Sequence, residues 1–153
     1  MIESAVPPGA SEKPHPPAEQ DADAARKQVI LLVDDESLMQ ELGKELLEEQ
    51  GYHVMIAGDG LEAVEVFRRH RDEIDLVILD LLMPKLDGGR TYIELKKIKN
   101  DLKAFFCTGY TPHEIIGPLL AEESLRALQK PFRPAEFVEI VREMLSSDHS
   151  PAN

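Results

Sequence analysis

The chain has 153 residues, of which 42% are hydrophobic and 30% are charged, so it can bury one core of ordinary size and hardly two. Its formal net charge of -12 disfavours a nucleic-acid partner, because phosphate binding depends on clustered Lys and Arg. The sequence starts without a secretory leader and has no run of about 18 apolar residues, so we expect no membrane contact and a cytoplasmic location.

The two ends of the chain differ in composition from its middle. Residues 1–26 contain five of the eleven prolines and no periodic apolar face, which is typical of a disordered tail. Residues 147–153 are polar and predict a short C-terminal tail. Residues 27–146 alternate strand-like and helix-like segments, so we expect the folded domain there.

The first predicted strand is the apolar run Val29–Val33, which ends on the paired acids Asp34–Asp35. A strand that is buried on both faces of a parallel sheet is apolar at nearly every position, as this one is. A helix should follow, with Ser37 as its cap and Gly51 as its stop. Its sheet-facing stripe is expected to consist of Leu38, Leu42 and Leu46.

The second unit is shorter. Residues 52–57 predict a strand, and Asp59 followed by Glu62 resembles a capping box at the start of a helix. A cap is therefore the expected role of Asp59. The inward-facing residues of this helix should be Ala63, Val64 and Phe67.

The third predicted strand, residues 74–80, is a near-continuous apolar run interrupted only by Asp75, and it ends on Asp80. Pro84 and Gly88 follow within a few residues, and neither continues a strand, because proline lacks a backbone donor and glycine favours turns. Asp80 should therefore stand at the end of a central strand, beside a loop. Asp87 in that loop is better explained as a turn residue than as part of a site.

Two further strands are expected in the second half. After a helix at residues 89–98, a strand at residues 102–107 should end at Thr108 and bury the single cysteine, Cys107. A helix start at Thr111 follows, and Gly117-Pro118 should interrupt that helix early.

The fifth strand should cover residues 125–129 and end at Lys130, before a last helix at residues 134–146. Five strands that alternate with helices predict an α/β fold with a parallel sheet and helices on both faces. The sheet-facing residues of the last helix are spaced as one buried face: Phe137, Ile140, Val141, Met144 and Leu145.

Polar residues stand at four of these strand ends. Because the carboxyl ends of parallel strands meet at one edge of the sheet, Asp34, Asp35, Asp80, Thr108 and Lys130 should converge there. Three neighbouring carboxylates repel unless a cation lies among them, and hard oxygen ligands favour Mg²⁺. A hydroxyl and an ammonium beside the cation suit a bound phosphoryl group, which the Asp80 carboxylate could accept as an acyl phosphate.

Four short motifs occupy these strand ends: Val-Asp-Asp-Glu at 33–36, Asp-Leu-Leu-Met-Pro-Lys-Leu-Asp-Gly at 80–88, Thr-Gly at 108–109 and Lys-Pro-Phe at 130–132. Together they resemble the receiver domain of two-component response regulators, over about residues 29–145. The resemblance implies a flavodoxin-like, doubly wound sheet of strand order 2-1-3-4-5.

The resemblance also implies a role for each acid. Asp80 would be the phospho-acceptor, Asp35 a direct Mg²⁺ ligand and Asp34 a ligand that acts mostly through water. The backbone carbonyl of Leu82 would complete the protein ligands.

The remaining motif positions are implied to bind the phosphoryl oxygens. These are Thr108 and Lys130, and the bond between Lys130 and Pro131 would be cis. One position departs from the family pattern: Ala127 stands where receivers commonly carry Tyr or Phe, which puts the usual threonine–aromatic switch in doubt.

The resemblance predicts a phospho-acceptor switch with at most self-phosphorylation and self-dephosphorylation activity. Its partners would be a sensor histidine kinase or a histidine phosphotransfer protein, and a downstream protein target. A stand-alone regulator is expected, because no output domain follows the last helix. A phosphorelay shuttle is an alternative, and so is a receiver-like scaffold that takes no phosphate. A haloacid dehalogenase-like phosphatase is disfavoured, because Leu82 replaces the second Asp that it needs.

Overall fold

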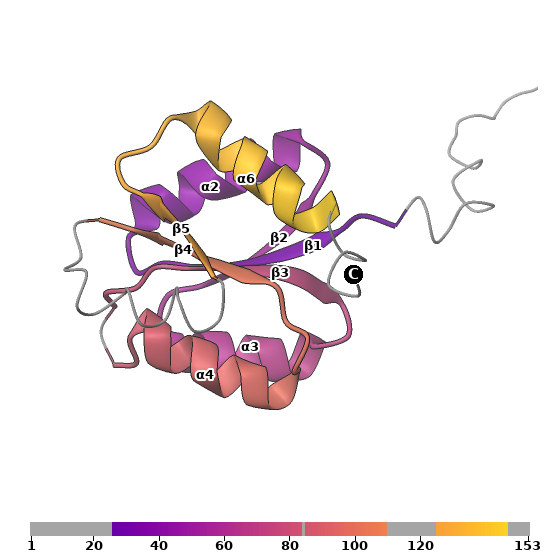
Figure 1. Cartoon of the computed structure of the whole chain (residues 1–153), viewed down its shortest axis with the longest axis vertical. Coiled ribbons are helices and arrows are strands. Elements are labelled where there is room, and N and C mark those ends of the chain that lie inside the picture. The colour runs from indigo at the N-terminus through magenta and orange to yellow at the C-terminus, as the bar shows by residue number, and fades with distance from the viewer. Residues whose placement is uncertain (1–25, 84, 110–124, 147–153) are drawn as a thin grey trace, which may run out of the picture.

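The protein forms a five-stranded parallel sheet of order β2-β1-β3-β4-β5, as the computed structural model shows (Figure 1). This confirms the predicted fold class. The structure describes residues 26–83, 85–109 and 125–146. Its elements are β1 (Val29–Val33), α2 (Ser37–Glu49), β2 (His53–Ala57), α3 (Gly60–His70), β3 (Ile74–Leu79), α4 (Gly88–Ile98), β4 (Ala104–Thr108), β5 (Arg126–Gln129) and α6 (Pro134–Ser146).

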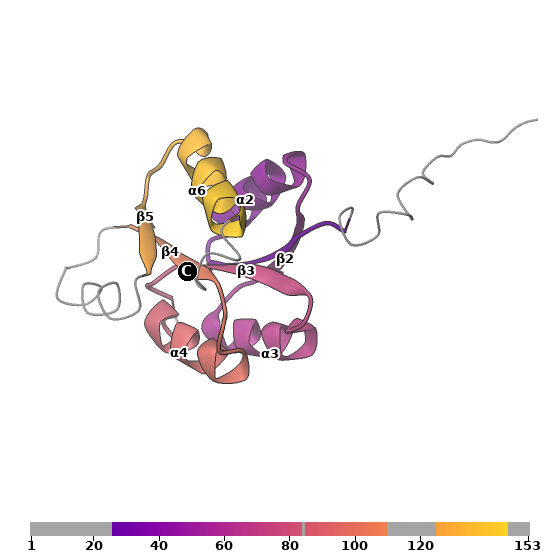
Figure 2. The same ribbon diagram turned by 45° about the vertical axis from the view of Figure 1, so that its right-hand side comes forward.

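The helices cover both faces of the sheet, with α2 and α6 on one face and α3 and α4 on the other (Figures 1 and 2). Successive residues of a strand point to opposite faces, so β1 contributes side chains to both layers of the core. Leu31 packs in the layer that contains Phe67, while Leu32 packs in the layer that contains Phe137. All five residues of β1 are buried, as its apolar sequence predicts.

The predicted sheet-facing stripe of α2 is wrong by one residue. Leu38 is 77% exposed and Leu42 is 44% exposed, and the leucine at 46 is only partly buried. The buried residues of this helix are Met39, Gly43 and Leu47. Both sets have the same four-residue spacing, and glycine in the middle of the true stripe hides it from a search for large apolar residues.

The start of α2 also differs from the prediction. Glu36, rather than Ser37, is the N-cap residue, and no side chain caps the helix. Gly51 has a positive φ of 97° directly after the C-cap, which confirms it as the stop of the helix.

The other predicted elements agree with the structure to within two residues at each boundary, and α6 agrees at both ends. Asp59 is confirmed as a cap residue, because its side chain accepts a hydrogen bond from the backbone N–H of Glu62. Asp87, predicted as a turn residue, is the N-cap of α4, where its side chain accepts a hydrogen bond from the backbone N–H of Arg90. Cys107 is buried, as expected. The helix predicted from Thr111 lies outside the described residues.

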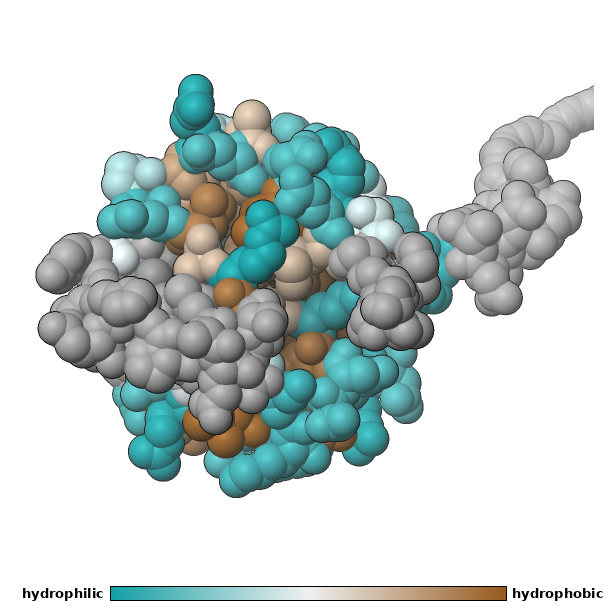
Figure 3. Space-filling view, in the orientation of Figure 1, coloured by the Kyte–Doolittle hydropathy of each residue, from teal (hydrophilic) through white to brown (hydrophobic). Residues whose placement is uncertain are grey.

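The surface agrees with the strongly charged composition. Hydrophilic residues cover much of the outer surfaces of the helices in the orientation of Figure 1, with smaller apolar areas between them (Figure 3). Among the helices that the structure describes, none has the length and hydropathy that crossing a membrane requires.

The loop between β3 and α4 is held against the first turn of α3. Lys85, which has a positive φ of 69°, places its Nζ 3.3 Å from Asp59 Oδ2. Gly60 lies so close to the Leu86 carbonyl and the Thr91 side chain that a Cβ on this glycine would overlap both. The loop that follows Asp80 is therefore positioned by close contact with α3.

We expect Gly60→Ala to lower the free energy of unfolding by about 1–3 kcal/mol, because the added methyl group must displace a backbone carbonyl. The matched control is Gly58→Ala, since a Cβ at Gly58 would make only ordinary contacts of 3.5 Å or more. Urea denaturation of both variants measures the difference. Equal free energies of unfolding for the two variants would show that the loop moves to accept the methyl group without loss of stability.

Candidate functional site

Two acids are brought together by the pairing of β1 with β3. Val33 pairs with Leu79 in the parallel register, so Asp34 and Asp80 emerge side by side where the two strands end. The N–H of Asp80 donates to the Val33 carbonyl at 3.0 Å, which extends the ladder to this residue. Oxygen atoms of Asp34, Asp35 and Asp80 all lie within 4.8 Å of one another. The predicted convergence of the three carboxylates is confirmed.

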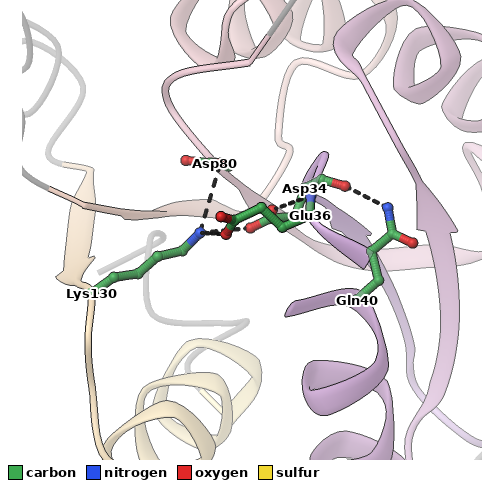
Figure 4. Close-up of polar contacts among 5 residues, drawn as sticks. All are labelled: Asp34, Glu36, Gln40, Asp80 and Lys130. Atoms are coloured by element: carbon green, nitrogen blue, oxygen red, sulfur yellow. Dashed lines mark hydrogen bonds and ion pairs between the residues drawn. The ribbon is translucent and has the colours of Figure 1, made fainter. Parts of the chain in front are cut away.

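Lys130 reaches the same place from the end of β5 (Figure 4). Its Nζ lies 2.9 Å from Asp34 Oδ2 and 3.7 Å from Asp80 Oδ2. It also lies 3.5 Å from Glu36 Oε1. The peptide bond between Lys130 and Pro131 is cis, as the resemblance implies. One ammonium therefore contacts three carboxylates at the edge of the sheet.

Asp34 is the most constrained of the acids. It is 2% exposed, and its Oδ1 accepts the backbone N–H of Glu36 at 2.9 Å while its Oδ2 contacts Lys130. The side-chain amide of Gln40 donates to the Asp34 backbone carbonyl at 2.6 Å. Asp35, by contrast, is exposed. Both carboxylate oxygens of Asp34 thus have protein partners, and the exposed Asp35 is the better placed of the two to bind a cation directly.

Burial and charge change the protonation of this cluster. Burial, and next the nearby Asp34 carboxylate, raise the pKa of Asp80 to about 6. Burial alone would lower the pKa of Lys130, but the hydrogen bond to Asp34 and the charges of Asp34 and Asp80 outweigh it and raise the pKa. Burial also raises the pKa of the Cys107 thiol to about 12, so this cysteine stays a neutral core residue.

The donor set fits Mg²⁺. Three carboxylates face one lysine, so the cluster carries excess negative charge. After burial, the charge of Asp34 is the second cause of the raised pKa of Asp80. Hard oxygen ligands of this kind are the ones that Mg²⁺ prefers. The backbone of Leu82 lies at the same place, because its N–H donates to the Asp80 carboxylate. Leu82 exposes its side chain to solvent.

Thr108 is the last residue of β4 and pairs with Gln129, next to Lys130 in the chain. Its backbone stands at the expected strand end, and its side chain lies outside what the structure describes. Ala127 lies on β5 and is exposed, so no aromatic ring occupies that position.

Two residues beside the site were not predicted from the sequence. Glu36 contacts Lys130, and Gln40 holds the Asp34 backbone. The Val-Asp-Asp-Glu motif contains Glu36, but nothing in it indicates that this side chain turns toward a lysine 94 residues away. The position of Gln40 one turn into α2 could have suggested contact with the preceding loop.

The sequence model of the response regulator receiver domain matches residues 30–142. The chain belongs to this family. The match runs from the second residue of β1 into α6, and it includes every acid of the cluster together with Lys130.

Curated receiver-containing relatives are longer than this chain. The sensor kinase CckA of Brucella abortus is 34% identical over 127 residues, which are 83% of this chain and 13% of the relative. The transcriptional regulatory protein CpxR of Escherichia coli K12 is 35% identical over 121 residues, which are 78% of this chain and 50% of that protein. The chain thus spans about half or less of these relatives, and the stand-alone architecture stays a prediction.

Solved receiver domains share the fold. A receiver domain protein of Clostridium thermocellum aligns with a TM-score of 0.71 and 30% identity, covering 78% of this chain and 94% of that one. The response regulator TrrA of Thermotoga maritima, solved in complex with Mg(2+)-BeF, aligns with a TM-score of 0.68 and 35% identity. That alignment covers 77% of this chain and 99% of TrrA.

Proposed function

We propose that this receiver domain accepts a phosphoryl group on Asp80 in a Mg²⁺-dependent reaction and thereby switches its interaction with a protein partner. One observation carries the proposal: Asp80 stands at a central strand end, between two further acids and the Lys130 ammonium. The TrrA complex with Mg(2+)-BeF supports the choice of metal, because TrrA is a similar receiver of known structure.

In this proposal each side chain has a distinct task. The Asp80 oxygen is the nucleophile, and with a pKa of about 6 it is mostly ionised at neutral pH. Lys130 would turn from Asp34 toward the phosphoryl oxygens and offset their charge, with the Thr108 hydroxyl as a second donor. Asp35, Asp34 and the Leu82 carbonyl would hold Mg²⁺ together with Asp80. A bound Mg²⁺ would supply positive charge where the transferring phosphoryl group is most negative.

The proposed donors are a sensor histidine kinase or a histidine phosphotransfer protein, and the proposed target is a protein. Relatives of this domain occur in a sensor kinase and in transcriptional regulators, so both relay and output settings are represented among them. We propose no nucleic-acid contact by this chain itself, since its net charge of -12 opposes one. We also propose a cytoplasmic location, where these donors act.

Incubation with acetyl phosphate and Mg²⁺, followed by intact mass measurement, tests the proposal. We expect a phosphate adduct that forms with Mg²⁺ and fails to form with EDTA. Rapid consumption of acetyl phosphate without an adduct would instead support the phosphatase alternative. Neither adduct nor turnover would leave a receiver-like scaffold and contradict the proposal.

A further inference from the structure

Glu36 is the acid of the site that the proposed chemistry leaves without a task. It is the N-cap residue of α2, yet its side chain does not cap the helix. Instead it turns toward Lys130, where its Oε1 lies 3.5 Å from Nζ (Figure 4). Its side chain is 66% exposed, in contrast to the buried Asp34 and Asp80. Glu36 therefore places a solvent-exposed carboxylate next to the lysine that also contacts the reacting carboxylate.

The position of Glu36 adds a solvent-exposed negative charge beside a site that is already acidic. Glu36 and Asp80 contact the same ammonium, at 3.5 Å and 3.7 Å, so their nearest oxygens lie within about 7 Å of each other. At about 7 Å in water, one additional unit charge on an incoming molecule changes a rate or equilibrium constant by about threefold. A phosphoryl donor that approaches Asp80 must come within this range.

We propose that Glu36 makes the site select phosphoryl donors by net charge. Donors that carry a compensating positive charge, such as phosphoramidate with its protonated nitrogen, are favoured over acyl phosphates, which are dianions at neutral pH. This inference rests on the proposed function and names the class of donor that the site takes. It is carried by the contact of an exposed, non-capping glutamate with the lysine that also contacts Asp80.

The two donor classes undergo the same transfer. An Asp80 oxygen forms a bond to phosphorus while the bond from phosphorus to the leaving atom breaks, and the leaving atom keeps the electron pair. Acetyl phosphate releases acetate, which needs no proton. Phosphoramidate in its zwitterionic form releases ammonia, whose three protons are already on the nitrogen. The donors thus differ in charge by one unit at neutral pH, while the acceptor and the bond formed are the same.

The test compares phosphorylation rates with acetyl phosphate and with phosphoramidate at saturating Mg²⁺, low ionic strength and pH 7, followed by intact mass. In Glu36→Gln we expect the ratio of the acetyl phosphate rate to the phosphoramidate rate to rise about threefold over the parent. The ratio should return toward the parent value in 1 M salt, where charges are screened within about 3 Å. Loss of a purely structural contact would change both rates alike and leave the ratio unchanged.

Two matched variants complete the test. Glu45→Gln removes the same charge from an exposed position on α2, and Glu36→Asp keeps the charge at residue 36; both should retain the parent ratio. An unchanged ratio in Glu36→Gln, or the same change in Glu45→Gln, would overturn the inference. A parent that takes phosphate from neither donor would overturn the proposed function as well, so the two failures are distinguishable.

Discussion

Replacement of Asp80 by asparagine is expected to stabilise the metal-free protein by about 2–3 kcal/mol at pH 8 and by very little at pH 4. The pKa of Asp80 is raised from 3.8 to about 6 in the folded protein, by burial first and by Asp34 second. The folded state therefore binds the Asp80 proton more tightly than the unfolded state does. Stability from this group is present below about pH 4 and is lost as the pH rises through about 6.

Asparagine is close in shape to a protonated aspartate and carries no charge at any pH. The variant should therefore match the parent at pH 4, where Asp80 is protonated, and exceed it at pH 8, where the parent holds an ionised carboxylate against Asp34. Urea denaturation in EDTA at both pH values gives the difference directly. Asp101→Asn, at an exposed position, is the matched control and should change little. A variant that is less stable than the parent at pH 8 would contradict the raised pKa.

Replacement of Asp35 by asparagine should weaken Mg²⁺ binding by more than about tenfold and nearly abolish phosphorylation. Asp35 is the exposed acid of the cluster, while both carboxylate oxygens of Asp34 have protein partners. The fold should stay intact, because removal of one of three converging carboxylates relieves repulsion.

A Mg²⁺ titration followed by backbone amide chemical shifts measures the affinity of the Asp35→Asn variant. The control is again Asp101→Asn, which removes the same charge far from the cluster in sequence and should bind Mg²⁺ as the parent does. An unchanged Mg²⁺ affinity in Asp35→Asn would refute its assignment as a ligand.

The strands could be predicted from the sequence because each buried parallel strand is a nearly continuous apolar run, while their order was implied only by the resemblance to receiver domains. β1 and β3 are the clearest cases, and each is followed directly by the acids that form the cluster. Once the strands are in a parallel sheet, Asp34, Asp80 and Lys130 must meet at one edge, whatever the details of the loops. This is why the candidate site was predictable although its members are far apart in the sequence.

Helix faces and side-chain directions were harder to predict. The stripe of α2 was misplaced because Leu38 and Leu42 are large and apolar, while the true stripe includes Gly43. A Cβ at Gly43 would lie 2.7 Å from a methyl group of Leu32, so the small residue allows α2 to approach the sheet closely. Such a close approach is a property of packing between elements, which apolar periodicity along one helix does not contain.

The contact between Glu36 and Lys130 depends on tertiary structure in the same way. The two residues are 94 positions apart, and a glutamate at a helix start is ordinarily explained by the helix dipole. Only the meeting of β1 and β5 ends at one edge brings the two side chains within 3.5 Å. The local sequence therefore predicts the acids at the strand ends but not the contact of Glu36 with Lys130.

The location of the phosphoryl group tests the proposed function most directly. The protein is phosphorylated with acetyl phosphate in Mg²⁺ buffer and reduced with borohydride, which converts an aspartyl phosphate into homoserine, and its peptides are then analysed by mass spectrometry. We expect homoserine at residue 80 alone, and none when EDTA replaces Mg²⁺. Homoserine at residue 34 or 35, or an adduct that forms equally without Mg²⁺, would contradict the assignment of Asp80 as the acceptor.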